Sequence, residues 1–215
     1  MTIQPPAGAT APPDVIYVIR HGEKPADPPV TGPEQFPPPT GPPFGVDDQG
    51  NQDAHSLLPR GWQRSGALAV LFDPALGPLQ AGLLAPAALL SPSYGSQDKT
   101  AGHRTYQTIQ GLSDRLGLAI VSGFAEGQEP QLAASVVSSY SGVVLICWEH
   151  NHIPALAQSL PAAPGTVIPP AWPGDRFDVI WMFTLVPAAA SIQYAFSQIP
   201  QQLLSGDSDT VIAAS

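Results

Sequence analysis

The sequence predicts an α/β fold, a single domain with a mostly parallel central sheet and helices on both faces. Three observations lead to this prediction. Short apolar runs alternate with stretches of helical period along the chain, as in proteins built from βαβ units. The strongest runs are apolar almost without interruption, which is typical of strands buried on both faces. The length of 215 residues is enough for one sizeable core and does not demand two.

The first strand is expected at residues 14–19, Asp-Val-Ile-Tyr-Val-Ile, a short run rich in β-branched side chains. The preceding residues 1–13 are small, polar and rich in proline, and we interpret them as a flexible N-terminus ahead of a domain at 14–215. The strand ends directly at Arg20 and His21. Polar residues at the carboxyl end of a buried strand are where open α/β sheets bind their ligands.

The next segment, residues 25–43, holds nine prolines in nineteen positions. Proline fixes φ and lacks an N–H group, so this segment can form neither a helix nor a central strand. We expect an irregular flap that leaves the strand end. Two interpretations stay open: a lid over the substrate, or a loop exposed to solvent.

The spacing of apolar residues predicts the rest of the chain. In the helix expected at residues 58–72, apolar residues recur at three- and four-residue intervals, and Arg60 and Arg64 are expected to face outward. Further elements are expected as an apolar run at 86–91, a helix at 103–116, a strand at 118–121, a helix at 130–140, a strand at 143–148, a helix at 153–160 and a strand at 177–185.

The charge balance excludes two classes of partner. The chain has 17 acidic and 8 basic residues, a formal net charge of −9, so nucleic acid and anionic membrane surfaces would repel it. Residues 1–13 lack the basic start and apolar run of a secretory signal, and no apolar stretch is long enough to span a bilayer. We therefore expect a soluble, cytoplasmic protein. The single cysteine, Cys147, rules out an internal disulfide and is expected to pack in the core.

Histidine follows two of the expected strands: His21 after the first, and His150 after a later one. Arg20 precedes His21, and Arg104 lies near the start of a helix. In a parallel sheet these four side chains would meet at one edge, together with helix N-termini. Guanidinium groups and helix N-termini both bind phosphate, so the sequence predicts a phosphate pocket there. A neutral His21 in this pocket could attack phosphorus.

These residues resemble the histidine phosphatase superfamily, also called the phosphoglycerate-mutase-like family, and so imply its fold. Two departures stand out. Glu149 replaces the glycine that precedes the family's second histidine, and the segment between Ser91 and Arg104 is several residues longer than usual. Four stretches carry the resemblance in the family's order, within residues 14–185: Val18–Glu23 with Arg-His-Gly-Glu, Leu58–Ala67 with its spacing shifted by one residue, Ser91-Pro92 with Arg104–Thr108, and Val143–Asn151.

The resemblance implies a phosphatase that hydrolyses phosphomonoesters through a phosphohistidine on His21. Arg20, Arg104 and His150, with His21 itself, would bind the phosphoryl oxygens, and a small phosphorylated molecule or phosphate ion would be the ligand. The arginines would take the electrostatic role of a metal, so neither a metal nor another cofactor is expected. Substrate identity and oligomeric state are not specified by the sequence.

The general acid is less well determined than the nucleophile. Many family members use a glutamate two to three dozen residues past the second arginine, and Glu126 and Glu129 lie at the near edge of that window. Glu149 is a third candidate because it adjoins His150, although neighbouring residues on a strand point to opposite faces. We favour Glu126. Glu23 is expected either at the rim of the site or simply in solvent.

Three alternatives remain open. A mutase is disfavoured because Arg104 and His150 are only 46 positions apart, which leaves a small cap over the pocket and admits water. A protein that binds phosphate or another anion without turnover would keep the same pocket. A metal site could form from His150 and His152 with Glu149, but zinc would need a further ligand or an open position.

Overall fold

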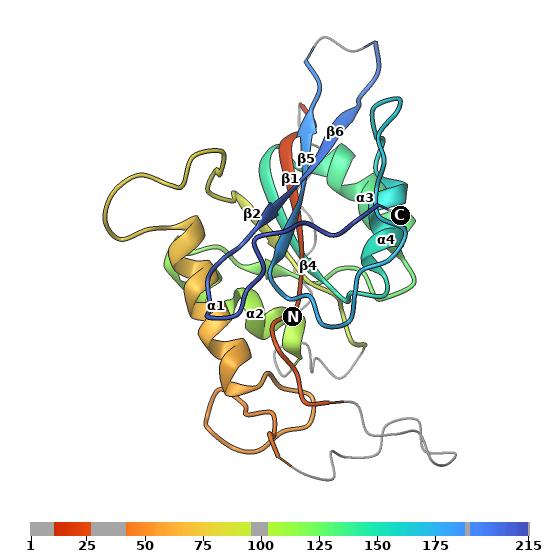
Figure 1. Ribbon diagram of the computed structural model, residues 1–215. Coiled ribbons are helices and arrows are strands. Elements are labelled where there is room, and N and C mark those ends of the chain that lie inside the picture. Colours follow the sequence, from red (N-terminus) through yellow and green to blue (C-terminus); the bar gives the residue numbers. More distant parts are fainter. Residues whose placement is uncertain (1–10, 27–41, 96–102, 188–189, 215) are drawn as a thin grey trace.

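A computed structural model describes residues 11–26, 42–95, 103–187 and 190–214. Figure 1 shows its elements arranged around one central sheet. The helices are α1 (Pro59–Phe72), α2 (Arg104–Leu116), α3 (Glu129–Ser139) and α4 (Ile153–Ser159). The strands are β1 (Pro13–Arg20), β2 (Ala88–Leu90), β3 (Ile120–Val121), β4 (Gly142–Trp148), β5 (Val179–Leu185) and β6 (Tyr194–Pro200).

The sheet has six strands in the order β3-β2-β4-β1-β5-β6. Pairing is parallel from β3 to β1, whereas β5 runs antiparallel to both β1 and β6. Five strands therefore run in one direction and β5 alone runs against them, which confirms the predicted mostly parallel sheet. In the β1–β4 pair, Arg20 lies opposite Trp148. Both strands thus end at the same edge of the sheet.

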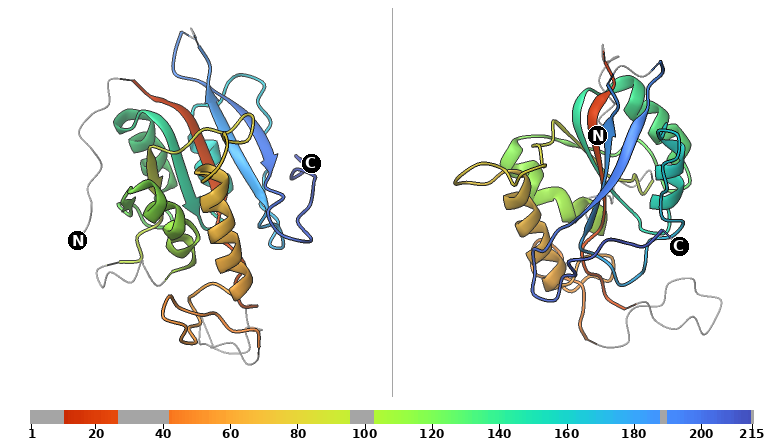
Figure 2. Two further views of the ribbon diagram at one scale, coloured as in Figure 1. Left: turned by 90° about the vertical axis from the view of Figure 1, so that its left-hand side faces the viewer. Right: turned by 45° about the horizontal axis from the view of Figure 1, so that its top comes forward.

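Helices cover both faces of the sheet, as predicted. Alternate residues of β1 divide between two cores: Ile16 and Val18 pack with α3 and α4, while Tyr17 and Ile19 pack with α1 and α2. The right-hand view in Figure 2 shows the two helix pairs on opposite sides of the sheet. All four of these β1 side chains are fully buried. Burial of a side chain of this kind contributes roughly 1.5–3 kcal/mol, so both faces of β1 stabilise the fold.

Two expectations from the sequence need correction. Arg64 was expected to face outward on its helix, but it is 1% exposed because carboxylates from distant parts of the chain surround it. The strand β6 (Tyr194–Pro200) was not predicted. It is an edge strand with polar residues such as Gln198 and a terminal proline, so its apolar pattern is weak.

Several expectations fall outside the described residues. Most of the proline-rich flap, residues 27–41, and most of the N-terminal segment, residues 1–10, are among them. Residues 96–102, within the extended segment before Arg104, are also outside the described part. Across the residues that are described, every helix is too short or too polar to cross a membrane.

Candidate functional site

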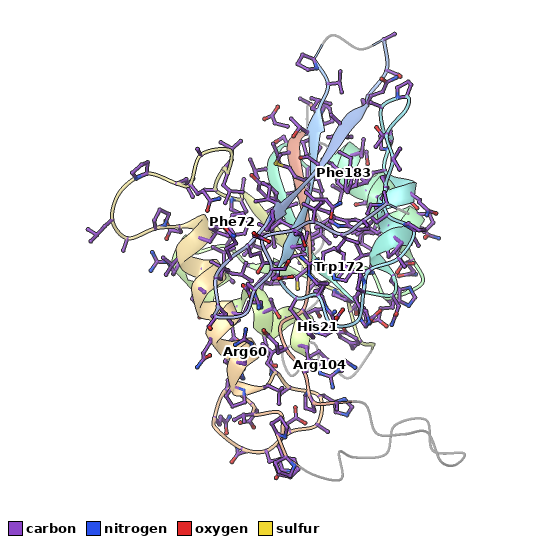
Figure 3. All side chains as sticks on the ribbon, viewed as in Figure 1. His21, Arg60, Phe72, Arg104, Trp172 and Phe183 are labelled. Atoms are coloured by element: carbon purple, nitrogen blue, oxygen red, sulfur yellow. The ribbon has the colours of Figure 1, made fainter. Side chains whose placement is uncertain are left out.

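The candidate site lies where β1 and β4 end side by side. His21 follows β1, and Glu149 and His150 follow β4, so the parallel register brings the two histidines together. Their rings meet edge to face, with centroids 5.9 Å apart. Figure 3 shows His21 and Arg104 close to each other at this end of the molecule. The structure thus brings together the strand-end residues that the sequence singled out.

The start of α1 packs directly against the backbone that carries His21. A Cβ added at Gly61 would lie 2.5 Å from the carbonyl oxygen of Glu23, and one added at Gly22 would lie 3.0 Å from the carbonyl oxygen of Gly61. The backbone N–H of Leu58 also donates to the carbonyl oxygen of Glu23 at 2.9 Å. Only glycine fits such a close approach, which explains why both positions are glycine. The contact fixes the loop after β1.

Helix α2 holds the same loop from another side. The backbone N–H of Gly22 donates to Oγ1 of Thr108 at 2.8 Å, and this hydroxyl donates to the carbonyl oxygen of Arg104 at 2.6 Å. Thr108 is fully buried. One hydroxyl therefore ties His21's neighbour to the first turn of α2. The arrangement sets Arg104 close enough for its charge to act on His21.

His21 is held in one orientation and kept uncharged. Its Nδ1 lies 2.7 Å from the carbonyl oxygen of Gly22. Because a carbonyl can only accept, Nδ1 carries the proton and Nε2 of the neutral ring has a free lone pair. Burial, followed by the charge of Arg20, holds the pKa of His21 well below its ordinary value of 6.5; Arg104 and His150 act in the same direction. The predicted effect of the arginines is thus present, but burial is the larger cause.

Arg20 is a buried arginine anchored at one end of its guanidinium group. Its Nη1 donates to the carbonyl oxygens of Pro173, Gly174 and Arg176 at 3.0–3.2 Å. The guanidinium carbon also lies 3.8 Å from the ring centroid of Phe177. Burial lowers the pKa of Arg20 to about 10, although nearby carboxylates oppose the shift. The group remains charged at neutral pH.

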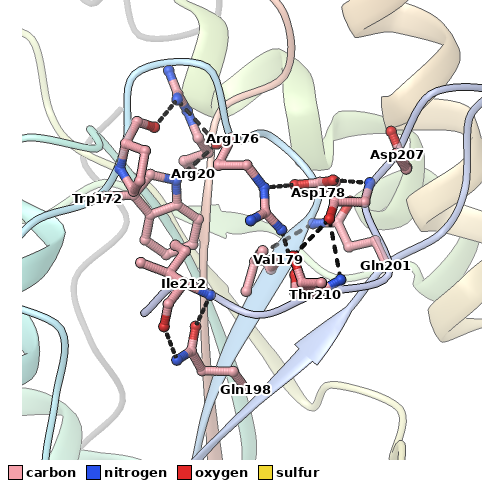
Figure 4. A network of polar contacts seen from close by, with 12 residues as sticks. Arg20, Trp172, Arg176, Asp178, Val179, Gln198, Gln201, Asp207, Thr210 and Ile212 are labelled. Atoms are coloured by element: carbon pink, nitrogen blue, oxygen red, sulfur yellow. Dashed lines mark hydrogen bonds and ion pairs between the residues drawn. The ribbon is translucent and has the colours of Figure 1, made fainter. Parts of the chain in front are cut away.

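The loop that anchors Arg20 is itself braced, as Figure 4 shows. The indole N–H of Trp172 donates to the carbonyl oxygen of Arg176 at 2.8 Å. The side chain of Arg176 donates to Asp178 at 2.7 Å and to the carbonyl oxygen of Thr210 at 2.6 Å. These contacts join the loop to β5 and to the C-terminal segment. Arg20 is therefore held by a rigid frame.

The remaining donors of Arg20 lack partners in the part of the chain that the structure describes. Among the described residues, neither Nε nor Nη2 of Arg20 has a hydrogen-bond acceptor, although both atoms are buried. A buried donor without an acceptor costs about 1–3 kcal/mol, and more when the group is charged. Nε and Nη2 lie on one edge of the guanidinium plane, the edge that binds carboxylate or phosphate through two parallel hydrogen bonds. An anion could satisfy both of these donors at once.

Glu149 and His150 form a close pair in the turn after β4. Nδ1 of His150 lies 2.5 Å from Oε1 of Glu149, although the two atoms are not aligned for a hydrogen bond. Asn151 donates to the Glu149 carboxylate from its backbone at 2.7 Å and from its side chain at 3.1 Å. Burial alone would raise the pKa of Glu149, but His150 and Asn151 outweigh it and the pKa lies below its ordinary value. Glu149 is ionised.

The expectation that Glu149 would point away from its neighbour on a strand is wrong. Strand β4 ends at Trp148, and Glu149 lies beyond it in a turn, where side chains no longer alternate. One nitrogen from each of His21 and His150 and one oxygen of Glu149 all lie within 4.8 Å of one another. Glutamate at position 149 therefore places a carboxylate inside the candidate site.

The two other candidate acids differ from each other. Glu126 is accessible to solvent, yet the protein around its carboxyl group, followed by the charge of Glu149, raises its pKa. Glu129 is 3% exposed and its Oε1 accepts from the indole of Trp148 at 3.0 Å and from the backbone of Gly127 at 2.9 Å. Glu129 thus braces the structure, whereas Glu126 has the raised pKa expected of a proton donor.

His152 does not join the metal site considered from the sequence. Its Nδ1 lies 3.1 Å from Oε1 of Glu129, on the side of α3. The cluster with ligand spacing that the described residues do form consists of His21, Glu149 and His150. His21 comes from a different strand end, 128 positions before Glu149, and so no local spacing rule could have found this cluster.

Glu23 lies neither at the rim of the site nor in solvent. It is 8% exposed and accepts from Nε of Arg60 at 3.0 Å and from Nη2 of Arg64 at 2.8 Å. Arg64 also donates to Gln201 and Asp207. The Glu of the Arg-His-Gly-Glu stretch therefore belongs to a buried ion-pair network that joins α1 to the C-terminal segment. Cys147 is fully buried in β4, as expected, and burial raises the pKa of its thiol.

Known proteins show little similarity to this chain. No protein-family model matches the sequence, and no curated protein matches it. The fold is similar to that of a solved chain named "Mycobacterial hydrolase 1", with a TM-score of 0.45 and 15% sequence identity over 86% of this chain and 97% of that chain. A similarity this low supports no conclusion about activity. The function must be argued from the side chains.

Proposed function

We propose that the protein is a phosphatase of the histidine phosphatase superfamily, which hydrolyses phosphomonoesters of small molecules through a phosphohistidine on His21. One observation carries the proposal: buried Arg20 has two donors without acceptors among the described residues, and its charge acts on a neutral, oriented imidazole. A dianionic phosphoryl group would satisfy both donors of the guanidinium edge. Arg104 and His150 would bind its other oxygens.

In the first step, Nε2 of His21 attacks phosphorus in line with the leaving oxygen. An N–P bond forms as the P–O bond to the alcohol breaks, and the general acid gives its proton to the leaving oxygen. The arginines stabilise charge on the equatorial oxygens in the transition state. The proton stays on Nδ1, which keeps donating to the Gly22 carbonyl oxygen, and this hydrogen bond helps to stabilise the positive charge that develops on the ring.

In the second step, water attacks phosphorus from the side that the alcohol has left. The acid, now a carboxylate, removes a proton from this water, and the N–P bond breaks. Inorganic phosphate and neutral His21 result, and the acid is protonated again. No group is oxidised or reduced, and the arginines supply the charge stabilisation that a metal would otherwise provide.

We assign the general acid to Glu126. Two carboxylates whose surroundings move their pKa values in opposite directions divide naturally into an acid and an ionised partner. The protein around its carboxyl group and the charge of Glu149 raise the pKa of Glu126, while His150 and Asn151 outweigh burial and lower that of Glu149. Glu126 thus holds a proton at a pH where Glu149 has lost its own.

The test uses p-nitrophenyl phosphate and an alkyl phosphate with purified protein in EDTA. Wild type should release phosphate from both, and His21→Ala should abolish release from either. Glu126→Gln should lower kcat/KM, which reports the first step, about 10²–10⁴-fold for the alkyl phosphate and far less for p-nitrophenyl phosphate, because a good leaving group needs little protonation. Wild type that binds phosphate but hydrolyses neither ester would be an anion-binding protein instead. Phosphate exchange between the hydroxyls of a glycerate would favour a mutase.

A further inference from the structure

The candidate site holds a set of side chains that the phosphatase mechanism does not require together. A nitrogen of His21, a nitrogen of His150 and an oxygen of Glu149 lie within 4.8 Å of one another. Two imidazoles with one carboxylate form a ligand set that zinc accepts in proteins. Glu149 supplies the carboxylate of this set. The proposed reaction does not use it, because Glu126 is the general acid.

Hydrogen bonds from surrounding groups orient two of these side chains, as is usual for metal ligands. Metal-binding imidazoles usually donate their second N–H to a carbonyl oxygen, and ligating carboxylates accept hydrogen bonds from neighbours. His21 makes the first kind of contact, because its Nδ1 lies 2.7 Å from the carbonyl oxygen of Gly22. Glu149 makes the second, because Asn151 donates to both of its carboxylate oxygens. With Nδ1 engaged in this contact, Nε2 is the nitrogen of His21 whose lone pair can bind a metal.

We propose that His21, Glu149 and His150 bind a divalent transition metal, zinc best of all, and that the bound metal blocks the phosphoryl site. The metal is an inhibitor here and not a cofactor. Nε2 of His21 has a single lone pair, so it cannot bind a metal and attack phosphorus at the same time. The inhibitory part of this proposal rests on the phosphatase function proposed above, whereas metal binding does not.

Metal binding requires a modest rearrangement. With Zn–N and Zn–O distances of about 2.1 Å, two ligand atoms of a tetrahedral zinc lie about 3.4 Å apart. The ligand atoms lie within 4.8 Å of one another, so they must draw together by at most about 1.4 Å. Glu149 and His150 lie in a turn and their side chains are partly exposed, at 20% and 13%. Rotation of these two side chains can provide the movement, while His21 keeps its hydrogen bond to the carbonyl oxygen of Gly22.

The charges of the site set the strength of binding. Arg20 and Arg104 both act electrostatically on His21, and they oppose a cation at this position. Glu149 is the ligand that offsets them, since it carries the trio's negative charge. We therefore expect binding weaker than in a structural zinc site. Inorganic phosphate should compete with the metal, because it pairs with the same arginines and occupies the same histidines.

The experiment is a calorimetric titration of the purified, metal-free protein with Zn²⁺ in a buffer without phosphate. Wild type should bind one Zn²⁺, and Glu149→Gln should bind it at least tenfold more weakly. His152→Asn is the matched control, since His152 is the neighbouring histidine outside the trio. Its affinity should equal that of wild type. Co²⁺ in place of Zn²⁺ should give the visible absorption of a tetrahedral site in wild type and lose it in Glu149→Gln.

Phosphate competition and activity separate this proposal from the phosphatase proposal. Inorganic phosphate should weaken Zn²⁺ binding at least tenfold, and Zn²⁺ should inhibit hydrolysis of p-nitrophenyl phosphate competitively. Wild type without Zn²⁺ binding, or Glu149→Gln with unchanged affinity, would overturn the metal site even if hydrolysis in EDTA is normal. Zn²⁺ binding at this trio in a protein that hydrolyses no ester would keep the site and overturn the phosphatase.

Discussion

Two arginines of this protein are equally buried, each 1% exposed, but they are used in different ways. The guanidinium group of Arg64 donates to other side chains. Glu23, Gln201 and Asp207 accept from its Nε, Nη1 and Nη2 at 2.7–3.1 Å. Arg20 donates from Nη1 to backbone carbonyls, and within the described part of the chain its Nε and Nη2 have no acceptor.

The difference appears in the pKa values of the two groups. Burial disfavours the charged form of both, but the carboxylates of Asp207 and Glu23 outweigh it at Arg64 and raise the pKa of that group. At Arg20 burial prevails and lowers the pKa to about 10. Removing a fully paired buried cation destabilises a structure, because its partners stay buried without it, whereas a half-paired cation has donors left for a ligand. Burial alone does not tell the two apart.

The largest effect is expected for Arg64→Met. The substitution leaves Glu23 and Asp207 buried without their main partner, which should lower the free energy of unfolding by about 3–5 kcal/mol. Urea unfolding at neutral pH measures it. Arg60→Met is the control, because the Arg60 side chain is 43% exposed and its ion pairs should be worth at most about 1 kcal/mol. Equal losses in the two variants would contradict a structural role specific to Arg64.

Arg20→Gln should act on activity instead. Loss of a donor to the transition state typically costs about 10²–10³-fold in rate, or about 2.7–4 kcal/mol. We expect kcat/KM for p-nitrophenyl phosphate to fall by that factor. Stability should fall by less than in Arg64→Met, since the acceptors of Arg20 within the described residues are backbone carbonyls and not carboxylates. A variant with full activity would show that the free guanidinium edge is not the phosphate site.

Phosphate itself should sharpen the contrast. A ligand that binds only the folded protein stabilises it by about 2.7 kcal/mol at 100 times its Kd. Inorganic phosphate should therefore raise the Tm of both wild type and Arg64→Met. The gain in the free energy of unfolding should be similar in the two proteins. Arg20→Gln should lose most of this effect at the same phosphate concentration. Differential scanning calorimetry with sulfate-free and phosphate-free controls measures each shift in Tm. A full shift in Arg20→Gln would show that phosphate binds at a site that does not include Arg20.

The smallest effect concerns pH. The pKa of His21 in the folded protein lies well below its ordinary value, so the unfolded chain takes up a proton first as pH falls. Stability from this group is complete above about pH 6.5 and is lost at up to about 1.4 kcal/mol per pH unit below it. Wild type should therefore lose more stability than His21→Gln between pH 6.5 and 5. Arg20→Gln should reduce the slope in part, and parallel curves for wild type and His21→Gln would contradict a depressed pKa.

The contrast between the arginines also shows what the sequence could and could not predict. Arg20 adjoins a strand whose pattern is local, so its position at a sheet edge follows from about ten residues. Arg64 was predicted to face outward because its acceptors Gln201 and Asp207 lie 137 and 143 positions away. No local period reveals such partners. The antiparallel pairing of β5 with β1 has the same long-range character, since Val15 lies opposite Thr184.

The candidate site divides in the same way. His21, His150 and Arg104 were predictable because strand ends and a helix start determine where they lie. Glu149 was considered as an acid and as a metal ligand, but its position close to His21 was not predictable, because it depends on β4 ending one residue before it. Thr108, which ties the His21 loop to α2, is a further residue that the pattern of polar and apolar residues alone does not distinguish from a helix surface residue.

The central claim, that His21 accepts the phosphoryl group, is tested most directly by trapping the intermediate. Wild type is mixed with a ³²P-labelled phosphomonoester, quenched within the first turnover, and the labelled peptide is identified. We predict a label that is stable in alkali, labile in acid and located on His21, with none in His21→Ala. A label on a carboxylate such as Glu149, or phosphate release in a first turnover that leaves no labelled protein, would contradict the claim.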